Sequence, residues 1–207
     1  VLVAFCGGCI VMLTQRARGL AIGLLVATMA AGYGLSMIHW TQPEGRPITV
    51  RLLQGNVPQQ HKFDAGHILR ALEMYRAEVS AAPADLIAVP ETAFAVFPEY
   101  LPPGYLDSLK RFSASSGSFL MYGIPLTDGP GTYANSVAGI GPAGQSYRYD
   151  KHHLVPFGEF VLPGFRWFVD MMRIPLGDMT RGGDVQPAFA VKDQLVLPNV
   201  CYEDVFG

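Results

Sequence analysis

The hydrophobic pattern changes character near residue 41, where a nearly uncharged stretch gives way to short alternating apolar and polar segments. Residues 1–13 are wholly apolar, and residues 19–38 hold twenty positions without a formal charge. A helix rises 1.5 Å per residue, so twenty residues extend about 30 Å, the thickness of a bilayer core. Trp40 follows as an interfacial anchor. The pattern predicts a partial membrane helix, a basic loop and a full membrane helix (1–14, 15–18 and 19–40).

Two other structures share this apolar pattern, namely the core of a signal peptide and a buried helix of a soluble domain. The apolar run of a signal peptide is shorter and follows a basic segment, so a membrane span is favoured. Arg16 and Arg18 lie in the short loop between the two apolar stretches. The positive-inside rule places that loop in the cytoplasm. The residues after Trp40 are therefore predicted to lie outside the cytoplasm.

The remainder of the chain alternates between strand-like and helix-like periods. A polar linker over 41–47 precedes it. Asp64 is a predicted helix N-cap, because apolar residues follow it at positions that share one helical face. Helices alternating with short apolar strands predict a layered α/β domain over 48–207. The predicted strands are 48–53, 85–91, 119–126, 133–140, 146–151 and 195–200, and a second helix is predicted over 105–116.

A long connection over 152–187 is rich in Pro, Gly, aromatic residues and Met. Connections longer than about 15 residues are usually functional. Its apolar side chains favour a short helix packed on the core. The alternative is a flexible apolar arm that shields the site or touches the bilayer.

Composition excludes some classes of protein. The net charge of −2 gives no electrostatic footprint for nucleic acid. Cys6 and Cys9 form a C-x-x-C pair in the apolar stretch, without the second ligand pair that a metal site needs. His152 and His153 are adjacent, and adjacent side chains diverge on a strand, so no metal site is predicted there. Cys201 is the one cysteine of the globular part, and is either a small buried hydrophobe or a reactive thiol.

Three reactive groups are predicted at the C-terminal ends of strands, where α/β proteins present their functional residues. They are Glu91, Lys151 and Cys201. Each alone is typical of a solvated or buried side chain, but together they supply a nucleophile, a base and a cation. A thiol is mostly protonated at neutral pH, so Glu91 would take its proton. Lys151 and the backbone N–H of Tyr202 would then stabilise an oxyanion.

The motifs around these residues resemble those of the nitrilase, or carbon–nitrogen hydrolase, superfamily with its Glu–Lys–Cys triad. More narrowly they resemble the bacterial apolipoprotein N-acyltransferases. The resemblance covers about residues 50–205 and keeps the family's motif order. The motifs read Gln54-Gly-Asn-Val-Pro-Gln, Pro90-Glu91-Thr-Ala, Tyr149-Asp-Lys151-His-His-Leu-Val-Pro-Phe-Gly-Glu159-Phe and Asn199-Val-Cys201-Tyr-Glu203.

The resemblance implies a nitrilase-like αββα sandwich preceded by transmembrane helices, and a two-step acyl transfer without a cofactor. Cys201 would take an acyl chain from a phospholipid as a thioester. The amine of the lipid-modified N-terminal cysteine of an apolipoprotein would then accept that chain. Glu91 would be the base, and Lys151 would hold the oxyanion.

Four further residues receive roles from the resemblance. Glu159 would orient Lys151, while Glu203 and Tyr202 would support the site. Phe63 occupies the position of a gating aromatic, where some family members carry Trp. The sequence lacks family segments at both ends, so we expect an inactive fragment.

The resemblance also implies a monomer in the bacterial inner membrane, with the catalytic domain on the periplasmic side. Two alternatives remain. One is a membrane-tethered amidase or nitrilase that transfers acyl groups to water, which would release fatty acid or ammonia instead of N-acylated lipopeptide. The other is an inactive membrane-anchored binding module, which would lack a fast-reacting Cys201.

Overall fold

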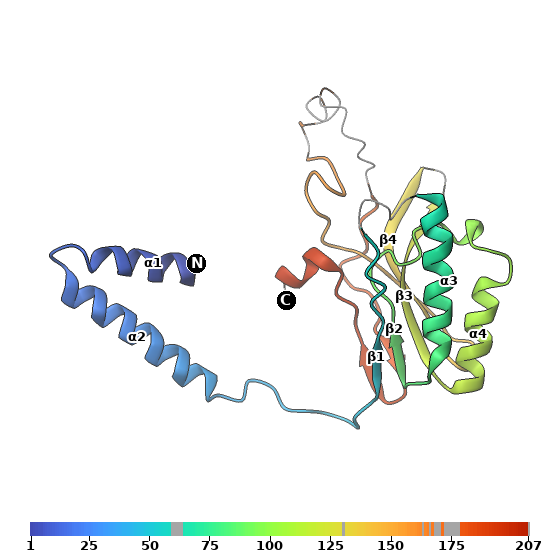
Figure 1. Ribbon diagram of the computed structural model, residues 1–207, viewed down its shortest axis with the longest axis horizontal. Helices are drawn as coiled ribbons and strands as arrows, with labels where there is room; N and C mark the ends of the chain where they lie inside the picture. The colour runs from blue at the N-terminus through green and yellow to red at the C-terminus, as the bar shows by residue number, and fades with distance from the viewer. Residues whose placement is uncertain are drawn as a thin grey trace. The chain divides into compact units, whose positions relative to one another are not determined.

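The protein is described by a computed structural model that divides into two compact units, residues 1–44 and 45–207. The first is helical and the second contains both sheets (Figure 1). The described residues are 1–58, 64–129, 131–162, 164, 165, 167, 171 and 179–206.

The first unit is a pair of helices, α1 (Leu2–Met12) and α2 (Arg18–Ser36), joined by a short turn. Among the described helices, α2 is the one with the length and apolar composition to cross a membrane. It ends at Ser36, before the predicted end of the membrane helix at residue 40. The N–H groups of Met37 and Ile38 donate to carbonyls three residues back, which tightens and closes the last turn.

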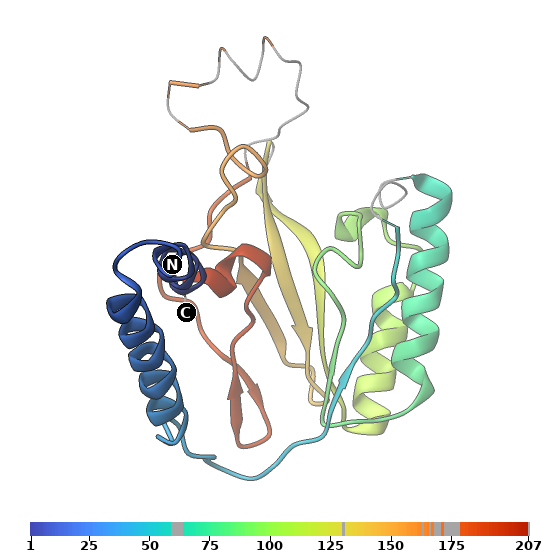
Figure 2. The same cartoon turned by 60° about the vertical axis from the view of Figure 1, so that its left-hand side comes forward.

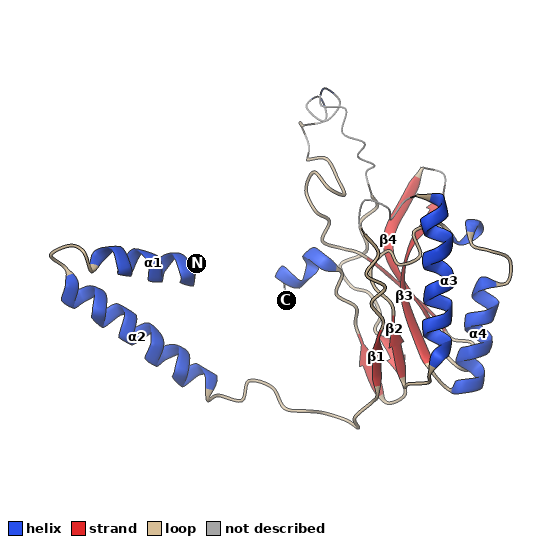
Figure 3. Ribbon diagram, in the orientation of Figure 1, coloured by secondary structure: helices blue, strands red, loops and turns tan. Residues whose placement is uncertain are grey.

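The second unit is built on a five-stranded sheet in the order β1-β2-β3-β4-β5 (Figure 3). The first three strands are parallel and the last two pairings are antiparallel. Parallel neighbours need long crossover connections, and two helices supply them. The strands are β1 (Val50–Leu52), β2 (Leu86–Ala88), β3 (Phe119–Gly129), β4 (Thr132–Ile140) and β5 (Ser146–Asp150).

The crossover helices α3 (Ala65–Ala81) and α4 (Tyr105–Ser116) cover one face of this sheet. The side chain of Asp64 accepts from the N–H of Gly66 at 3.2 Å, as its predicted N-cap role requires. A short 3₁₀ helix, η2 (Pro98–Tyr100), precedes α4. The helix-facing core gathers Leu72, Tyr75, Val79, Ile87, Phe94, Leu109, Leu120 and Ile124.

The opposite face of the sheet is covered by a hairpin of β6 (Phe189–Val191) and β7 (Gln194–Val196), drawn in red in Figure 2. The ring of Phe189 stacks on Tyr147 of β5, with 4.9 Å between centroids. This second core fixes the path of the chain from β7 to Val200, which is itself buried.

The mixed α/β fold class is confirmed, and α4 spans the predicted 105–116. The predicted strand over 195–200 is wrong. β7 ends at Val196 and pairs with β6 in a separate two-stranded sheet. Pro198 has no N–H to donate to a ladder, which stops the strand short. Cys201 therefore follows an irregular segment instead of a strand.

Candidate active site

Glu91 stands in a tight turn that follows β2, and Gly123 of the neighbouring strand β3 makes room for that turn. The N–H of Gly123 donates to the Pro90 carbonyl at 3.2 Å, and the N–H of Phe94 donates to the Gly123 carbonyl at 3.0 Å. A Cβ on Gly123 would lie 2.5 Å from the Pro90 oxygen and 2.7 Å from Glu91 Cα, and would also meet the nitrogen of Thr92. Only glycine allows the turn to approach this closely.

Lys151 follows β5 directly and is fully buried. Its backbone N–H donates to the Asn135 carbonyl on β4 at 2.9 Å, which continues the strand pairing past Asp150. Its ammonium donates to Glu159 Oε1 at 2.8 Å and lies 3.6 Å from Glu91 Oε1. The cation therefore contacts two carboxylates that are far apart in sequence.

The pKa of Lys151 is raised above its ordinary value. Burial lowers this pKa, but the hydrogen bond to Glu159 and the charges of Glu91 and Glu159 together outweigh burial. A negative charge on Cys201 acts in the same direction. Lys151 is thus an ammonium at neutral pH.

Asn135 joins the two carboxylates and was not among the residues indicated by the sequence. It is buried on β4, and its side-chain amide donates to Glu91 Oε1 at 2.6 Å and to Glu159 Oε1 at 3.3 Å. Asparagine is uncommon in strand interiors. An Asn within the apolar segment 133–140 is the sequence signal that could have indicated it.

Glu159 is buried and satisfied on both oxygens. Its Oε2 accepts from the N–H of Val155 at 2.9 Å, while Oε1 accepts from Lys151 and Asn135. Its own carbonyl accepts from the N–H of Met179 at 2.8 Å. These contacts fix the carboxylate against the Lys151 ammonium.

Cys201 is exposed and begins a short 3₁₀ helix, η3 (Cys201–Val205). Its exposure contradicts the interpretation of this residue as a small buried hydrophobe. Its backbone adopts φ +53°, a left-handed conformation that non-glycine residues rarely adopt. Such local strain persists only where surrounding contacts impose it, and it clusters at functional sites.

Glu203 supplies those surrounding contacts. Its Oε2 accepts from the N–H of Val200 at 3.0 Å. Its Oε1 accepts from the Tyr149 hydroxyl at 2.8 Å and from the N–H groups of His152 and His153 at 2.7 and 3.1 Å. One buried carboxylate therefore ties the Cys201 turn to the segment that follows Lys151.

The pKa of Glu203 lies below its ordinary value. Burial alone would raise this pKa, but the Tyr149 hydroxyl and three backbone N–H donors favour the carboxylate and outweigh burial. Tyr202, its neighbour, packs its ring edge-to-face on Phe206 with 5.2 Å between centroids.

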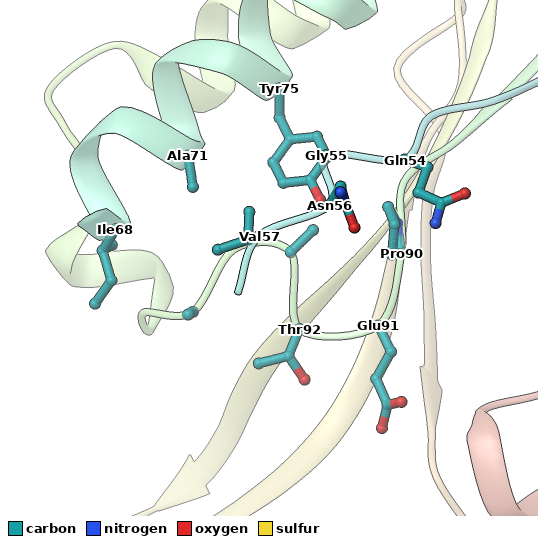
Figure 4. Close-up of a pocket in the computed structure, with 12 residues that line it drawn as sticks. Gln54, Gly55, Asn56, Val57, Ile68, Ala71, Tyr75, Pro90, Glu91 and Thr92 are labelled. Carbon is teal, nitrogen blue, oxygen red and sulfur yellow. The ribbon is translucent and has the colours of Figure 1, made fainter. Parts of the chain in front are cut away.

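Two cavities border the turn that follows β2, and Glu91 lines the first of them. The first, of about 260 Å³, is shown in Figure 4 and carries the polar side chains of Gln54, Asn56 and Tyr75. In that view the Glu91 carboxylate points away from Ile68 and Ala71 of α3. The second, of about 480 Å³, is mainly apolar and is lined by Phe97, Pro125, Tyr133 and Met179. Thr92 and Ala95 line both cavities.

The structure tests the remaining sequence predictions only in part. Phe63 lies outside the described residues, as does much of the 152–187 connection, so neither interpretation of that connection is decided. The rings of His152 and His153 do not diverge as predicted, since they meet edge-to-face at 4.6 Å beyond the end of β5. Within the described ranges, no cluster of His, Cys, Asp or Glu could hold a metal ion.

The chain also resembles known proteins in sequence and in fold. The sequence profile of the carbon-nitrogen hydrolase family matches residues 49–207. An apolipoprotein N-acyltransferase of Ralstonia nicotianae is 50% identical over 183 residues, covering 88% of this chain and 35% of that protein. One of Chromobacterium violaceum is 42% identical over 212 residues, covering 100% of this chain and 41% of that protein.

The fold has a solved counterpart in a carbon-nitrogen hydrolase superfamily protein of Xanthomonas campestris, which carries an arsenic adduct in its active site. The TM-score is 0.53 at 18% identity, and the match covers 79% of this chain and 56% of that chain. The chain spans less than half the length of the two curated relatives from Ralstonia nicotianae and Chromobacterium violaceum.

Proposed function

The chain belongs to the carbon–nitrogen hydrolase family, and from this premise we propose that it carries the catalytic centre of an apolipoprotein N-acyltransferase. The observation that carries the proposal is the buried Lys151 ammonium, which donates to Glu159 and lies 3.6 Å from Glu91. Glu203 ties the turn of the exposed Cys201 to the segment that follows this lysine. The names of the relatives at 50% and 42% identity support the choice of acyltransferase within the family.

In the first half of the reaction, Glu91 accepts the proton of the Cys201 thiol. The thiolate attacks the ester carbonyl carbon of a phospholipid, and the carbonyl electron pair moves onto oxygen. Lys151 stabilises this oxyanion, together with the backbone N–H of Tyr202. The ester C–O bond then breaks, Glu91 returns the proton to the departing oxygen, and lysophospholipid leaves a thioester on Cys201.

In the second half, the α-amine of a diacylglyceryl-modified N-terminal cysteine attacks the thioester carbon. Glu91 accepts a proton from that amine as the C–N bond forms. The C–S bond breaks, the thiolate leaves, and it recovers the proton from Glu91. The product is an amide, and the free thiol is ready for another cycle.

Glu159 and Glu203 act through other residues in this scheme. Glu159 accepts from the Lys151 ammonium at 2.8 Å, so the cation keeps a carboxylate partner when Glu91 is neutral. Glu203 holds the Cys201 turn against the segment after Lys151. Neither carboxylate needs to change its protonation state.

Membrane attachment fits this substrate pair, since both lipids are held in a bilayer. Helix α2 has the length and composition to anchor the chain there. We infer that the catalytic unit lies on the periplasmic side of the inner membrane. Arg16 lies between α1 and α2 and Arg18 begins α2, and basic residues at such a turn favour a cytoplasmic position.

The test uses the full-length protein in detergent micelles with phospholipid alone, and intact mass as the readout. We expect a mass increase of one acyl chain, which disappears in Cys201→Ala and is discharged by a diacylated lipopeptide. Variants Cys6→Ser and Cys9→Ser serve as matched controls and should keep the adduct. Turnover of simple amides or nitriles without any lipid adduct would instead assign the site to hydrolysis.

A further inference from the structure

The outer edge of β5, one residue before Lys151, is closed by the side chain of Gln186. Among the described strands β5 is the last of its sheet, so only β4 pairs with it. Lys151 donates its N–H towards β4, and the alternation of an antiparallel ladder turns the main chain of Asp150 to the outer edge. The Asp150 N–H donates to Gln186 Oε1 at 2.8 Å, and its carbonyl accepts from Gln186 Nε2 at 2.7 Å. The side-chain amide therefore replaces the peptide group that a further strand would supply.

The loop that carries Gln186 is itself held against the end of β5. Gln186 Nε2 also donates to the Gly183 carbonyl at 3.2 Å, and the N–H of Gly182 donates to the Lys151 carbonyl at 3.0 Å. A Cβ on Gly182 would collide with the Asp150 carbonyl oxygen and would lie 2.8 Å from Gln186 Nε2. Glycine at this position therefore lets the loop approach closely enough to bond two successive residues of the strand end.

These contacts complete the fixing of the Lys151 main chain. Its N–H donates to the Asn135 carbonyl on β4 at 2.9 Å, and its carbonyl accepts from the loop on the other side. A strand end without such partners exposes its backbone groups to water and opens locally at low cost. Because the Lys151 side chain is fully buried, a shift of this backbone would move the ammonium relative to Glu91 and Glu159.

We propose that Gln186 is a positioning residue for Lys151, and that its side-chain amide keeps the ammonium beside Glu91 and Glu159 by holding the end of β5. The inference rests on the proposed acyltransferase function, in which Lys151 stabilises the oxyanion. It requires both an acceptor and a donor at position 186. An amide supplies both, an ionised carboxylate only accepts, and a protonated carboxyl group again does both.

The first experiment measures single-turnover thioester formation by the full-length protein over a range of phosphatidylethanolamine concentrations. We expect Gln186→Ala to lower the maximal rate roughly 10- to 100-fold, the cost of a displacement of about 1 Å at a catalytic group. The half-saturating lipid concentration should change little, because the ammonium acts on an oxyanion that forms after binding. Gln145→Ala is the matched control and should keep the wild-type rate, since Gln145 Oε1 accepts from the Ala143 N–H at 3.0 Å in the turn before β5.

The second experiment follows Gln186→Glu from mildly alkaline to mildly acid pH, as a rate ratio to the wild type at each pH. The ratio should be low while the new carboxyl group is ionised and should rise towards one as it becomes protonated. The ratio of Gln186→Ala should not change with pH. Asp150, paired with Arg148, is the same in all the proteins compared. So are the titratable side chains that line the adjoining cavity, namely Tyr149, His152, His153, Asp184 and Glu203.

The outcomes separate this inference from the proposed function. A wild type that forms thioester, together with a wild-type rate in Gln186→Ala or a pH-independent ratio in Gln186→Glu, would overturn the positioning role alone. If Gln186→Ala does not fold, the comparison of Gln186→Glu across pH still decides. A wild type that forms no thioester would overturn the acyltransferase proposal, and this inference with it.

Discussion

The side-chain amide of Asn135 donates to Glu91 Oε1 at 2.6 Å, the shorter of the two contacts that it makes with carboxylates. Glu91 and Glu159 approach the same Lys151 ammonium, and their like charges repel each other. Asn135 offsets that repulsion by donating to both, without adding a charge of its own. It therefore acts as a positioning residue for the proposed base.

We predict that Asn135→Ala slows thioester formation by roughly 10- to 100-fold, because a hydrogen bond to a charged group contributes about 1.5–3 kcal/mol. The measurement is single-turnover acylation of the full-length protein, followed by intact mass. A positioning role predicts a lower kcat with little change in KM. Thr132 lies on the same strand, and its hydroxyl donates to the Gly129 carbonyl within its own turn. Thr132→Ala is therefore the control and should retain the wild-type rate. Equal rates in both variants would contradict the role of Asn135.

Local signals foretold the helices well. α4 has the predicted bounds, because Gly104 and Gly117 adopt left-handed conformations at its two ends and limit it to residues between them. α3 begins directly after the predicted N-cap Asp64, whose side chain accepts from the nearby N–H of Gly66. Such features depend on neighbouring residues in the sequence, so one sequence is sufficient to predict them.

Long-range pairings could not be foretold in the same way. Asn135 bonds to a carboxylate 44 residues away in sequence, and nothing near it announces that partner. The β6–β7 hairpin turns at Lys192, which adopts φ +55° without the Asn-Gly or Asp-Gly pair that usually marks such turns. The sequence pattern therefore predicts a longer strand over 195–200, which the structure does not contain.

Gly123→Ala tests the close approach that positions Glu91. The added methyl group would meet the turn at Pro90 and Glu91 within 2.7 Å, so either the turn or β3 must shift. We predict a loss of roughly 1–3 kcal/mol in the free energy of unfolding, typical of overpacking. We also expect at least a tenfold lower acylation rate, since the carboxylate moves with its turn. Denaturant unfolding and single-turnover acylation measure the two effects.

Gly129→Ala is the control for Gly123, because it lies on the same strand and its added Cβ would meet only Thr132 Oγ1, at 4.0 Å. Its stability and rate should match the wild type within error. If Gly123→Ala kept the wild-type rate despite a measured loss of stability, the turn would not be what positions Glu91.

Glu203→Gln tests the link between the Cys201 turn and the segment after Lys151. The amide can no longer accept as many hydrogen bonds, so Cys201 should lose its fixed position. We expect the variant to form thioester at least tenfold more slowly and to melt at a lower temperature. Tyr149→Phe removes one of the four donors and should have a smaller effect of the same kind.

The same carboxylate makes stability depend on acid pH. Because the folded-state pKa of Glu203 lies below its ordinary value of 4.5, its contribution is present above that pH. The contribution is lost as the pH falls through the folded-state pKa. Unfolding free energies measured over this range should fall less steeply in Glu203→Gln than in the wild type. Glu99→Gln, at an exposed position, should follow the wild-type curve.

Tyr147→Phe is expected to stabilise the domain, in contrast to the other substitutions. Among the described residues, its hydroxyl is a buried polar atom without a hydrogen-bond partner, while its ring stacks on Phe189. Removing an unsatisfied hydroxyl and keeping the ring should raise the free energy of unfolding by about 1 kcal/mol at neutral pH. Urea unfolding of the two proteins measures the difference, and a destabilised variant would show that the hydroxyl has a partner in solution.

The advantage of Tyr147→Phe should grow in alkali. Burial raises the pKa of Tyr147 to about 12, so the fold favours the neutral phenol. The contribution of this group is complete below its ordinary pKa of 10.0 and is lost as the pH rises towards about 12. Phenylalanine does not ionise, so the variant should unfold at a higher pH than the wild type. Tyr122, whose pKa is also raised to about 12 by burial, remains in both proteins and keeps some alkaline sensitivity. Coincident alkaline unfolding curves would show that the Tyr147 hydroxyl is solvated in the folded protein.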